Sequence, residues 1–304
     1  MNNSKIKIIV TGGCGFIGSH IVDKLINLSY DVHVIDDCSA EENESFYFNE
    51  KAKYYKISIC EKEKIDEIFK NCKYVFHLAA ESRIQPAIKN PTKAYQVNTI
   101  GTLNILELSK KYSIKKIVFS STSSIYGLTN QLPTKEKEKT NCLNPYSHSK
   151  FLAEELFRHY SKIYKIDSLI LRYFNVFGER SPIKGNYAPV VGIFLNQYRK
   201  NQKLTVVGSG NKKRDFIYVS DVVQANIAAI TIKKKFKAKI INIGSGENIS
   251  ILDLAFLISK NVEFLPERQG EAENTLANIE KAKKLLNFKP QKNIKNWILE
   301  QIKK

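Results

Sequence analysis

Short aliphatic and β-branched runs alternate with amphipathic stretches through the first half of the chain. The runs have the length and composition of buried strands, and they cover residues 5–10, 32–36, 54–57, 74–78, 117–121 and 168–174. Between them, apolar positions repeat at helical spacing over 17–28, 62–70, 92–112 and 146–164. Strands that alternate with helices pair in parallel through right-handed crossovers. The pattern therefore predicts an α/β fold with a doubly wound parallel sheet.

The pattern changes after about Phe177, where loops rich in glycine, proline and asparagine occur, such as segment 181–186. A later apolar run at 240–243 has the composition of a strand that returns to the first sheet, and helical patterns follow at 252–259, 279–286 and 294–302. We expect residues 1–176, with a returning segment at about 215–244, to form the main domain. Residues 177–304 would form a smaller domain interleaved with it.

Composition narrows the class of protein. The chain has 304 residues, 43% of them hydrophobic, and no apolar run approaches the ~18 residues that a membrane helix needs. The first ten residues lack the features of a signal peptide, so a cytoplasmic protein without a membrane partner is expected. The five cysteines include no CxxC pair and the five histidines have no ligand spacing on a helix face, which predicts neither disulfides nor a metal site.

The net charge of +18 raises the question of nucleic-acid binding, because basic surfaces attract phosphate backbones. Base and phosphate recognition favour arginine, yet only seven of the 48 basic residues are arginine. The lysines are spread along the chain and indicate a solvated surface. We therefore expect no nucleic-acid partner.

The first predicted strand runs directly into a glycine-rich segment that opens a helix. Gly12, Gly15 and Gly18 suit a tight turn, close approach of the backbone to a pyrophosphate, and close packing of helix on strand. Asp36 ends the second strand, where its carboxylate can accept hydrogen bonds from ribose hydroxyls and would repel a 2′-phosphate. The segment therefore predicts NAD rather than NADP. The alternative is that Asp36 only forms a turn with Asp37.

Three features indicate proton-transfer chemistry. Tyr146 and Lys150 stand at i and i+4 on one face of a predicted helix, and a serine-rich run that includes Thr122 and Ser123 ends the fifth strand. A tyrosine with a pKa of about 10 is a weak base at neutral pH, and an ammonium at about 4 Å could supply the missing ~4 kcal/mol. A hydroxyl of Thr122 or Ser123 could then orient the reacting oxygen. The alternative is that Tyr146 and Lys150 are an ordinary exposed pair.

Together with the segment 172–178, Arg-Tyr-Phe-Asn-Val-Phe-Gly, these motifs resemble the nucleotide-sugar epimerase branch of the extended short-chain dehydrogenases over nearly the whole chain. The resemblance implies a Rossmann domain that binds NAD, a small C-terminal domain for the nucleotide sugar, and a homodimer built on two long helices. The cofactor positions that it implies are Gly12, Gly15, Phe16, Ile17, Gly18, Asp36, Ser58, Ile59, Leu78, Ala79, Ala80, Asn98, Tyr146, Lys150 and Tyr173. The substrate positions that it implies are Ser82, Thr122, Ser123, Asn175, Val190, Arg214, Arg268 and Thr275.

The sequence also departs from its relatives. Many have Asp near the adenine where this chain has Ser58, and relatives that eliminate water or decarboxylate have a carboxylate where this chain has Ser123 and Ser124. The resemblance therefore implies C4 epimerisation of a UDP-sugar. Asn175 favours a neutral hexose or an N-acetylhexosamine, and the small Thr275 would tolerate an N-acetyl group.

Three alternatives stay open: a UDP-glucuronate 4-epimerase, a 4,6-dehydratase, and a non-catalytic NAD-binding regulator. Arg83 lies just past the fourth strand and receives no role from the sequence.

Overall fold

The computed structural model describes residues 5–40, 45–128, 131–183 and 188–303. Two parts of the sequence-based expectations, the extreme N-terminus at 1–4 and part of the loop at 181–186, lie outside the described residues. Within the described ranges, no helix is both long enough and apolar enough to cross a membrane.

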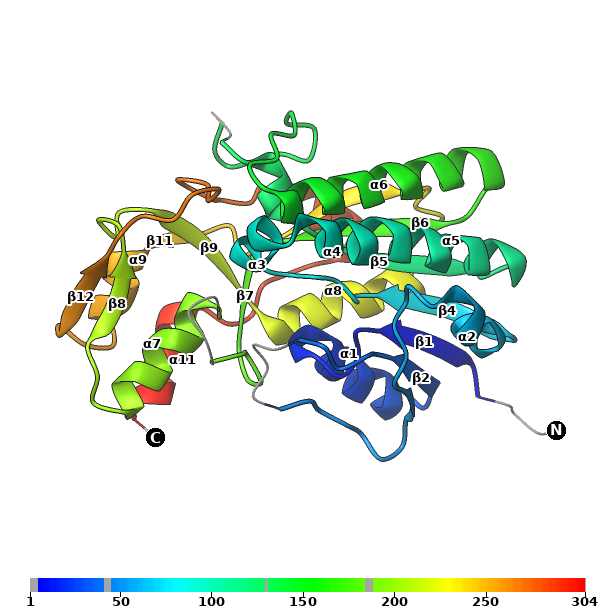
Figure 1. The fold of residues 1–304 in the computed structure, drawn as a ribbon, viewed down its shortest axis with the longest axis horizontal. Helices are drawn as coiled ribbons and strands as arrows, with labels where there is room; N and C mark the ends of the chain where they lie inside the picture. The colour runs from blue at the N-terminus through cyan, green and yellow to red at the C-terminus, as the bar shows by residue number, and fades with distance from the viewer. Residues whose placement is uncertain (1–4, 41–44, 129–130, 184–187, 304) are drawn as a thin grey trace.

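A seven-stranded parallel sheet forms the centre of the molecule (Figure 1). Its order is β10-β6-β5-β4-β1-β2-β3, and every neighbouring pair is parallel. The strands are β1 (Lys7–Thr11), β2 (Asp31–Ile35), β3 (Lys53–Tyr55), β4 (Cys72–His77), β5 (Lys116–Thr122), β6 (Ser168–Tyr173) and β10 (Lys239–Ile243). The order reverses next to β1, as in doubly wound folds. The predicted fold class is confirmed, and the run at 240–243 returns to this sheet beside β6.

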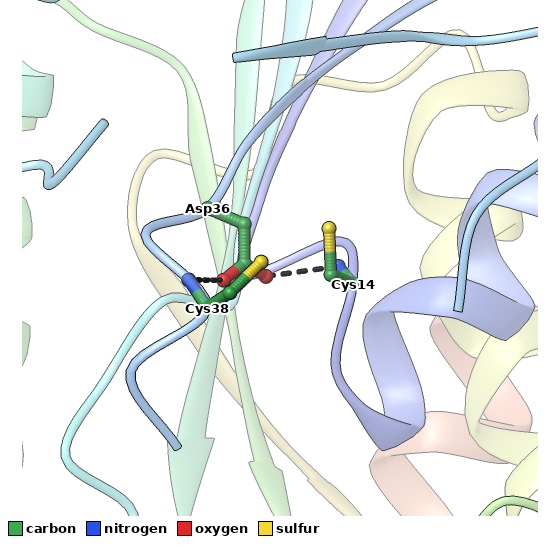
Figure 2. Close-up of side chains that lie close together, drawn as sticks. All are labelled: Cys14, Asp36 and Cys38. Carbon is green, nitrogen blue, oxygen red and sulfur yellow. Dashed lines mark hydrogen bonds between the residues drawn. The ribbon is translucent and has the colours of Figure 1, made fainter. Parts of the chain in front are cut away.

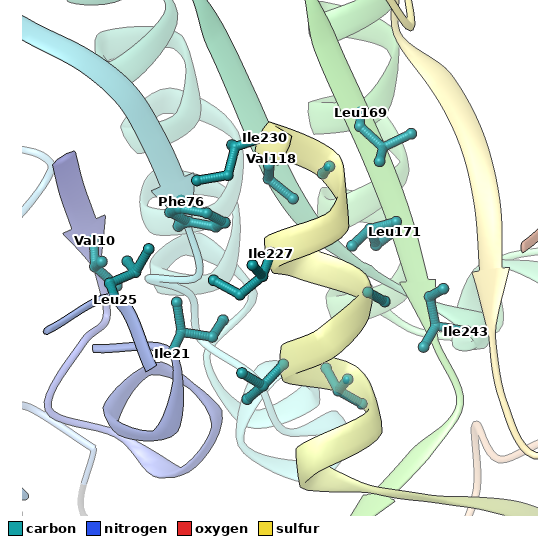
Figure 3. Packing of buried hydrophobic residues seen from close by; sticks show 14 of the residues in the cluster. Val10, Ile21, Leu25, Phe76, Val118, Leu169, Leu171, Ile227, Ile230 and Ile243 are labelled. Carbon is teal, nitrogen blue, oxygen red and sulfur yellow. The ribbon is translucent and has the colours of Figure 1, made fainter. Parts of the chain in front are cut away.

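Successive residues of each central strand belong to two different cores. Ile8 and Val10 face one core, which is completed by helices α1 (Phe16–Asn27) and α8 (Val219–Thr231); Figure 3 shows part of it. Ile9 faces a second core under α5 (Thr102–Lys111) and α6 (Pro145–Tyr164). Because both faces are covered by helices, the strands are apolar on both sides.

A smaller region lies beyond the carboxyl ends of these strands (Figure 1). It contains a three-stranded sheet, a two-stranded sheet and a separate core around Phe177, Phe194 and Trp297. Its strands are β7 (Asn175–Phe177), β8 (Leu204–Val207), β9 (Lys213–Tyr218), β11 (Asn248–Ser250) and β12 (Val262–Leu265). Its helices are α7 (Val190–Arg199), α9 (Ile251–Phe256) and α11 (Ile294–Ile302), while α10 (Glu280–Leu286) packs on the first core.

Several helices differ from the sequence-based expectation. The stretch 92–112, expected as one helix, is α4 (Pro91–Tyr95), a π-helical turn η2 (Gln96–Gly101) and α5. The stretch 62–70 is α2 (Lys62–Ile65) followed by a 3-10 turn, η1 (Asp66–Phe69). A short helix, α3 (Ile84–Lys89), and a 3-10 turn, η3 (Ser123–Tyr126), were not predicted, and neither were α7 and α8.

A buried ion pair joins α6 to the sheet. Arg172 on β6 donates from Nε and Nη2 to the two carboxylate oxygens of Glu154, at 2.9 and 2.6 Å. Both side chains are almost fully buried. The hydroxyl of Ser121 on β5 donates to the same carboxylate, and the guanidinium lies 4.7 Å from the ring centre of Tyr126. Such a pair is costly to break, because the charge left behind has no water around it.

We predict that Glu154→Gln lowers the free energy of unfolding by about 3–5 kcal/mol, because Arg172 would keep a buried charge without its counter-charge. The neighbouring Glu155 forms an exposed i,i+3 pair with Arg158, so Glu155→Gln should cost less than about 0.5 kcal/mol. Urea denaturation of both variants measures the difference. Equal midpoints would show that the buried pair does not anchor the helix.

Candidate active site

A cavity of about 530 Å³ opens where the carboxyl ends of the parallel strands meet the smaller region. Ligands bind at this edge in doubly wound folds. Of the predicted site residues, the cavity is lined by Gly12, Gly15, Phe16, Ile17, Gly18, Asp36, Ser58, Ile59, Leu78, Ala79, Ala80, Ser82, Thr122, Ser123, Tyr146, Lys150, Tyr173, Asn175, Val190, Arg214, Arg268 and Thr275. The structure thus brings together residues from both regions.

The glycine-rich turn packs so closely against neighbouring backbone that side chains would not fit at Gly12 and Gly18. Gly12 has a φ of +71°, and a Cβ there would lie 2.6 Å from the backbone nitrogen of Ala79. A Cβ at Gly18 would lie 2.1 Å from the carbonyl oxygen of Gly12. Helix α1 begins directly after the turn, so its free N–H groups and the positive end of its dipole face the cavity. These residues fit the pyrophosphate of a dinucleotide.

Asp36 lines the cavity and also organises two loops. Its carboxylate accepts hydrogen bonds from the backbone N–H groups of Cys14, at 2.8 Å, and Cys38, at 2.9 Å (Figure 2). The hydrogen bond to Cys38 closes an Asx turn, which is the turn-forming role that the sequence left open for Asp36. The same carboxylate also lines the cavity, in a position suited to a ribose. Burial raises the pKa of Asp36, and the two N–H groups oppose that shift.

Cys14, Asp36 and Cys38 could together hold a metal ion, since their ligand atoms lie within 4.8 Å of one another (Figure 2). Sequence spacing did not suggest this group, because the two cysteines are on different loops. Burial raises the pKa of both thiols and keeps them protonated, and both oxygens of Asp36 already accept N–H groups. A metal requires thiolates, so the chemistry of the group does not favour one. The absence of a metal stays a prediction.

Tyr146 lies in the first turn of α6, which Asn144 caps by accepting a hydrogen bond from the N–H of Ser147 at 2.8 Å. Thr122 is the last residue of β5 and lines the same part of the cavity. Burial raises the pKa of Tyr146, while a hydrogen bond to Thr122 and the charge of Arg83 lower it. The Thr122 hydroxyl and the Arg83 guanidinium thus oppose the effect of burial on the pKa of Tyr146.

Lys150 follows Tyr146 by one turn of α6 and lines the same cavity. The Nζ atom lies 4.2 Å from the ring centre of Phe119, and the side chain is only 3% exposed. Burial lowers the pKa of Lys150 to about 7, against the raising effect of Glu154. Both Tyr146 and Lys150 line the cavity, and the role that the sequence assigned to Lys150 in activating Tyr146 stays a prediction.

Asn98 does not line the cavity, although the sequence placed it in the cofactor pocket. It is buried in the turn η2, where its amide exchanges hydrogen bonds with the backbone of Glu81 and donates to the hydroxyl of Ser149, at 2.9 Å. That hydroxyl in turn donates to the carbonyl of Tyr146. Asn98 therefore fixes the segment after β4 against the start of α6.

Tyr173 and Asn175 line the cavity but direct polar atoms into the protein. The Tyr173 hydroxyl is bonded to Ser120 and Asn226, and burial raises its pKa to about 12. The Asn175 amide donates to the carbonyl of Asp215, at 2.9 Å, and to the Thr275 hydroxyl, at 3.4 Å. Both residues therefore also stabilise the boundary between the two regions.

Cationic groups gather at the far end of the cavity, in the smaller region. Arg214 is largely buried and lies 3.6 Å from a carboxylate oxygen of Glu271, and Arg268 lies in the following loop. Lys212, which sequence reasoning missed, lines the same end. It precedes β9 in a stretch that also contains Lys213, and only the fold shows which of the two faces inward.

Two hydrogen bonds tie the loop at 268–272 to the main domain. Gln85 on α3 donates to the carbonyl of Gln269, at 3.0 Å, and Asn144 donates to the carbonyl of Gly270, at 2.8 Å. Arg83, Gln85 and Asn144 all line the cavity, and the sequence gave none of them a role. Arg83 and Gln85 reach the cavity from the segment after β4, and Asn144 reaches it from the start of α6.

These features define a Rossmann-type enzyme of the short-chain dehydrogenase class. They are a parallel sheet, a glycine-rich dinucleotide turn, and a phenol and a lysine at the carboxyl edge of the sheet. Residues 8–244 match the NAD dependent epimerase/dehydratase family. The chain belongs to this family, and NAD is its cofactor.

Individual relatives cover almost the full chain. A Methanocaldococcus jannaschii protein, named provisionally as a UDP-glucose 4-epimerase, is 40% identical over 299 residues, 96% of this chain and 95% of the relative. The Thermotoga maritima UDP-glucose 4-epimerase, solved with UDP-glucose, aligns with a TM-score of 0.92 at 33% identity over 98% of both chains. The UDP-N-acetylglucosamine 4-epimerase of Methanobrevibacter ruminantium, solved with UDP-N-acetylmuramic acid, gives 0.90 at 32% identity over 99% of this chain and 98% of its own.

We predict that Asp36→Asn weakens NAD binding about tenfold, because an amide accepts hydrogen bonds less strongly than a carboxylate. The same substitution should reduce the preference for NAD over NADP. Asp31 stands at the opposite end of the same strand, so Asp31→Asn serves as the matched control and should bind both dinucleotides as the wild type does. Calorimetric titration of cofactor-stripped protein measures both affinities. An unchanged NAD affinity in Asp36→Asn would leave the carboxylate with its turn-forming role alone.

Proposed function

We propose that the protein catalyses the C4 epimerisation of a UDP-sugar. The observation that carries the proposal is the joint placement of Tyr146 and Thr122 in one cavity, between the glycine-rich turn and the cationic end at Arg214. The cavity offers one end to a dinucleotide and the other to a nucleotide diphosphate, with proton-transfer groups between them. The small-molecule partner is then a nucleotide sugar, and the protein needs no nucleic acid or membrane.

In the proposed reaction, the phenolate of Tyr146 takes the proton of the C4 hydroxyl, which the hydroxyls of Thr122 and Ser123 orient by hydrogen bonding. NAD would supply the hydride acceptor at C4 and would not be consumed, since the hydride is returned. Between the two transfers the transient 4-keto sugar turns in its pocket, so that the hydride returns to the opposite face of C4. The Tyr146 phenol then gives its proton back to the oxygen of the epimerised sugar. Asn98 holds the backbone of Glu81 by two hydrogen bonds. This contact keeps the segment after β4 against the start of α6 while these steps occur.

Residues at the cationic end would hold the rest of the substrate. Arg214 and Arg268 would bind the diphosphate, for which a planar guanidinium is well suited. Asn175, Val190 and Ser82 would line the sugar subsite. On the cofactor side, Asp36 would accept the ribose hydroxyls, and the serine at position 58 would replace a carboxylate near the adenine.

The residues around the reacting carbon favour epimerisation over two related reactions. Ser123 and Ser124 line the cavity where elimination or decarboxylation would need a carboxylate. Asn175 favours a neutral hexose or an N-acetylhexosamine over a uronate, and UDP-glucuronate 4-epimerisation is the second candidate because the hydroxyls at 122–124 could receive a carboxylate. A non-catalytic regulator would not need Tyr146, Thr122 and Lys150 in one cavity.

We further propose a cytoplasmic homodimer that uses α5 and α6. Ile163 and Tyr164 at the end of α6, and Ile100 before α5, are about half exposed, which leaves apolar surface along these helices.

The proposed domain division keeps residues 1–176 with the segment at about 215–244 in the cofactor domain, and places the rest of 177–304 in the substrate domain.

The central prediction concerns Tyr146. Tyr146→Phe should reduce turnover at least a thousandfold, because the other tyrosine that lines the cavity within the described residues, Tyr173, bonds its hydroxyl to Ser120 and Asn226. Tyr198→Phe, at an exposed position of α7, should leave turnover unchanged. NMR of the products formed from UDP-galactose, UDP-N-acetylgalactosamine and UDP-glucuronate measures this and identifies the substrate. A wild-type protein that holds NAD and converts none of them would favour the regulator.

A further prediction concerns Thr275, whose hydroxyl accepts a hydrogen bond from the N–H of Asp215 at 3.1 Å. Thr275→Tyr should reduce turnover of N-acetylated substrates at least tenfold more than turnover of unsubstituted hexoses, because the ring would occupy the space of the acetyl group. Thr275→Ser keeps the hydroxyl and should resemble the wild type. Equal losses on both kinds of substrate would remove Thr275 from the specificity determinants.

A further inference from the structure

Cys14 and Cys38 lie on the two loops that meet at the carboxylate of Asp36 (Figure 2). Both thiols are free, and their sulfur atoms lie within 4.8 Å of one another. A disulfide bond is about 2.05 Å long, so the two sulfurs can bond after side-chain rotation and a small shift of one loop. The fold thus places a dithiol pair beside the carboxylate that faces the ribose of NAD.

A second cavity, of about 260 Å³, reaches this pair next to β3. It is lined by both cysteines, Asp36, Lys56 and four aromatic side chains. Cys14 is only 1% exposed, whereas Cys38 is half-buried. Burial raises the pKa of Cys38, and the charge of Lys56 opposes that rise. A small oxidant therefore reaches Cys38 before Cys14.

We propose that Cys14 and Cys38 form a reversible disulfide that lowers the affinity of the protein for NAD. The proposal concerns the cofactor and does not depend on which sugar the enzyme converts. It makes the pair a redox modification site at the entrance to the dinucleotide subsite.

The oxidant is a peroxide, and the reaction has two steps. The sulfur of Cys38 attacks hydrogen peroxide, so that the O–O bond breaks, an S–O bond forms, and the departing hydroxide takes the thiol proton and leaves as water. The sulfur of Cys14 then attacks the sulfenic acid of Cys38, so that the S–O bond breaks, the S–S bond forms, and a second water leaves. Two thiols and one peroxide thus give one disulfide and two waters.

This chemistry suits the pair better than metal binding does. A metal needs both thiolates at the same time, whereas each oxidation step needs one thiolate, in a small equilibrium fraction. Disulfides of cytosolic proteins are mostly transient, and a dithiol such as dithiothreitol would return both thiols by exchange.

The packing around the pair explains why the disulfide affects NAD. The glycine-rich turn has little room to move, since a Cβ at Gly13 would lie 2.6 Å from the side chain of Val34. Cys38 has a φ of +56°, and its loop is held by the hydrogen bond of its N–H to Asp36 at 2.9 Å. The loop at 36–39 therefore moves when the sulfurs bond, and it shifts the carboxylate away from the ribose.

We expect about a tenfold loss of NAD affinity, the effect of one lost charge-assisted hydrogen bond. By thermodynamic linkage, bound NAD must disfavour the disulfide by the same factor. Saturating NAD should therefore raise the reduction potential of the pair by about 30 mV, the equivalent of tenfold for a two-electron couple.

The test uses the cofactor-stripped whole chain as wild type, Cys38→Ser, Cys14→Ala and Cys142→Ser. Cys142 is half-buried like Cys38, so Cys142→Ser is the matched control. After hydrogen peroxide, wild type and Cys142→Ser should show the link between residues 14 and 38 by peptide mass spectrometry. Both should bind NAD about tenfold more weakly in calorimetric titration until dithiothreitol is added. Cys38→Ser and Cys14→Ala should show no link and keep the NAD affinity that they have before oxidation.

Two results would overturn the proposal. One is oxidised wild-type protein in which Cys38 is overoxidised or joined to a cysteine other than Cys14. The other is the expected link with unchanged NAD affinity. If the enzyme converts no UDP-sugar, the proposed function fails, but both readouts still decide the fate of the switch because neither involves a sugar.

Discussion

The position of α6 is the constraint on which the site depends. This helix carries Tyr146 and Lys150, and it is fixed from the sheet side by the two hydrogen bonds between Glu154 and Arg172. From the other side, Asn98 in the turn η2 bonds to Ser149, and Ser149 bonds to the carbonyl of Tyr146. A buried bidentate pair tolerates little displacement, since its attraction compensates for desolvation only at good geometry. The phenol is therefore held at the sheet edge by contacts that lie outside the cavity.

Burial shifts the two main groups of α6 in opposite directions and favours the neutral form of each. It raises the pKa of Tyr146 and lowers the pKa of Lys150 to about 7. An ammonium on Lys150 would stabilise a phenolate on Tyr146 and the reverse, so each charge would offset part of the desolvation of the other. The same low-dielectric surroundings that disfavour the phenolate make a nearby cation more effective.

Most of the central sheet could be predicted from sequence because its strands are covered on both faces and form continuous apolar runs. Helix α8 (Val219–Thr231) could not, because Val, Ile and Ala occupy most of its circumference and leave little helical periodicity to detect. The π-helical turn around Asn98 also escaped prediction, since one wider turn barely changes the apolar pattern of 92–112. Strands such as β7 and β11 have three residues each, too few to show an alternation.

Part of the candidate site could likewise be predicted from the sequence, and part of it could not. The glycine turn, Asp36, Tyr146 and Lys150 could be predicted because their chemistry depends on local spacing. The contacts of Lys150 and Asn98 could not, because tertiary packing decides them: Lys150 lies over the ring of Phe119, and Asn98 bonds to Glu81 and Ser149. Cys14 and Cys38 lie close together only because Asp36 bonds to both of their loops.

The attachment of the loop at 268–272 has a consequence for ligand exchange. Gln85 and Asn144 hold it through two neutral hydrogen bonds to backbone carbonyls, each worth about 1 kcal/mol. The core around Phe177 and Trp297 does not include this loop. Glu271 of the same loop also lies 3.6 Å from Arg214 of the smaller region, so a ligand exchange that displaced the loop would break contacts to both regions.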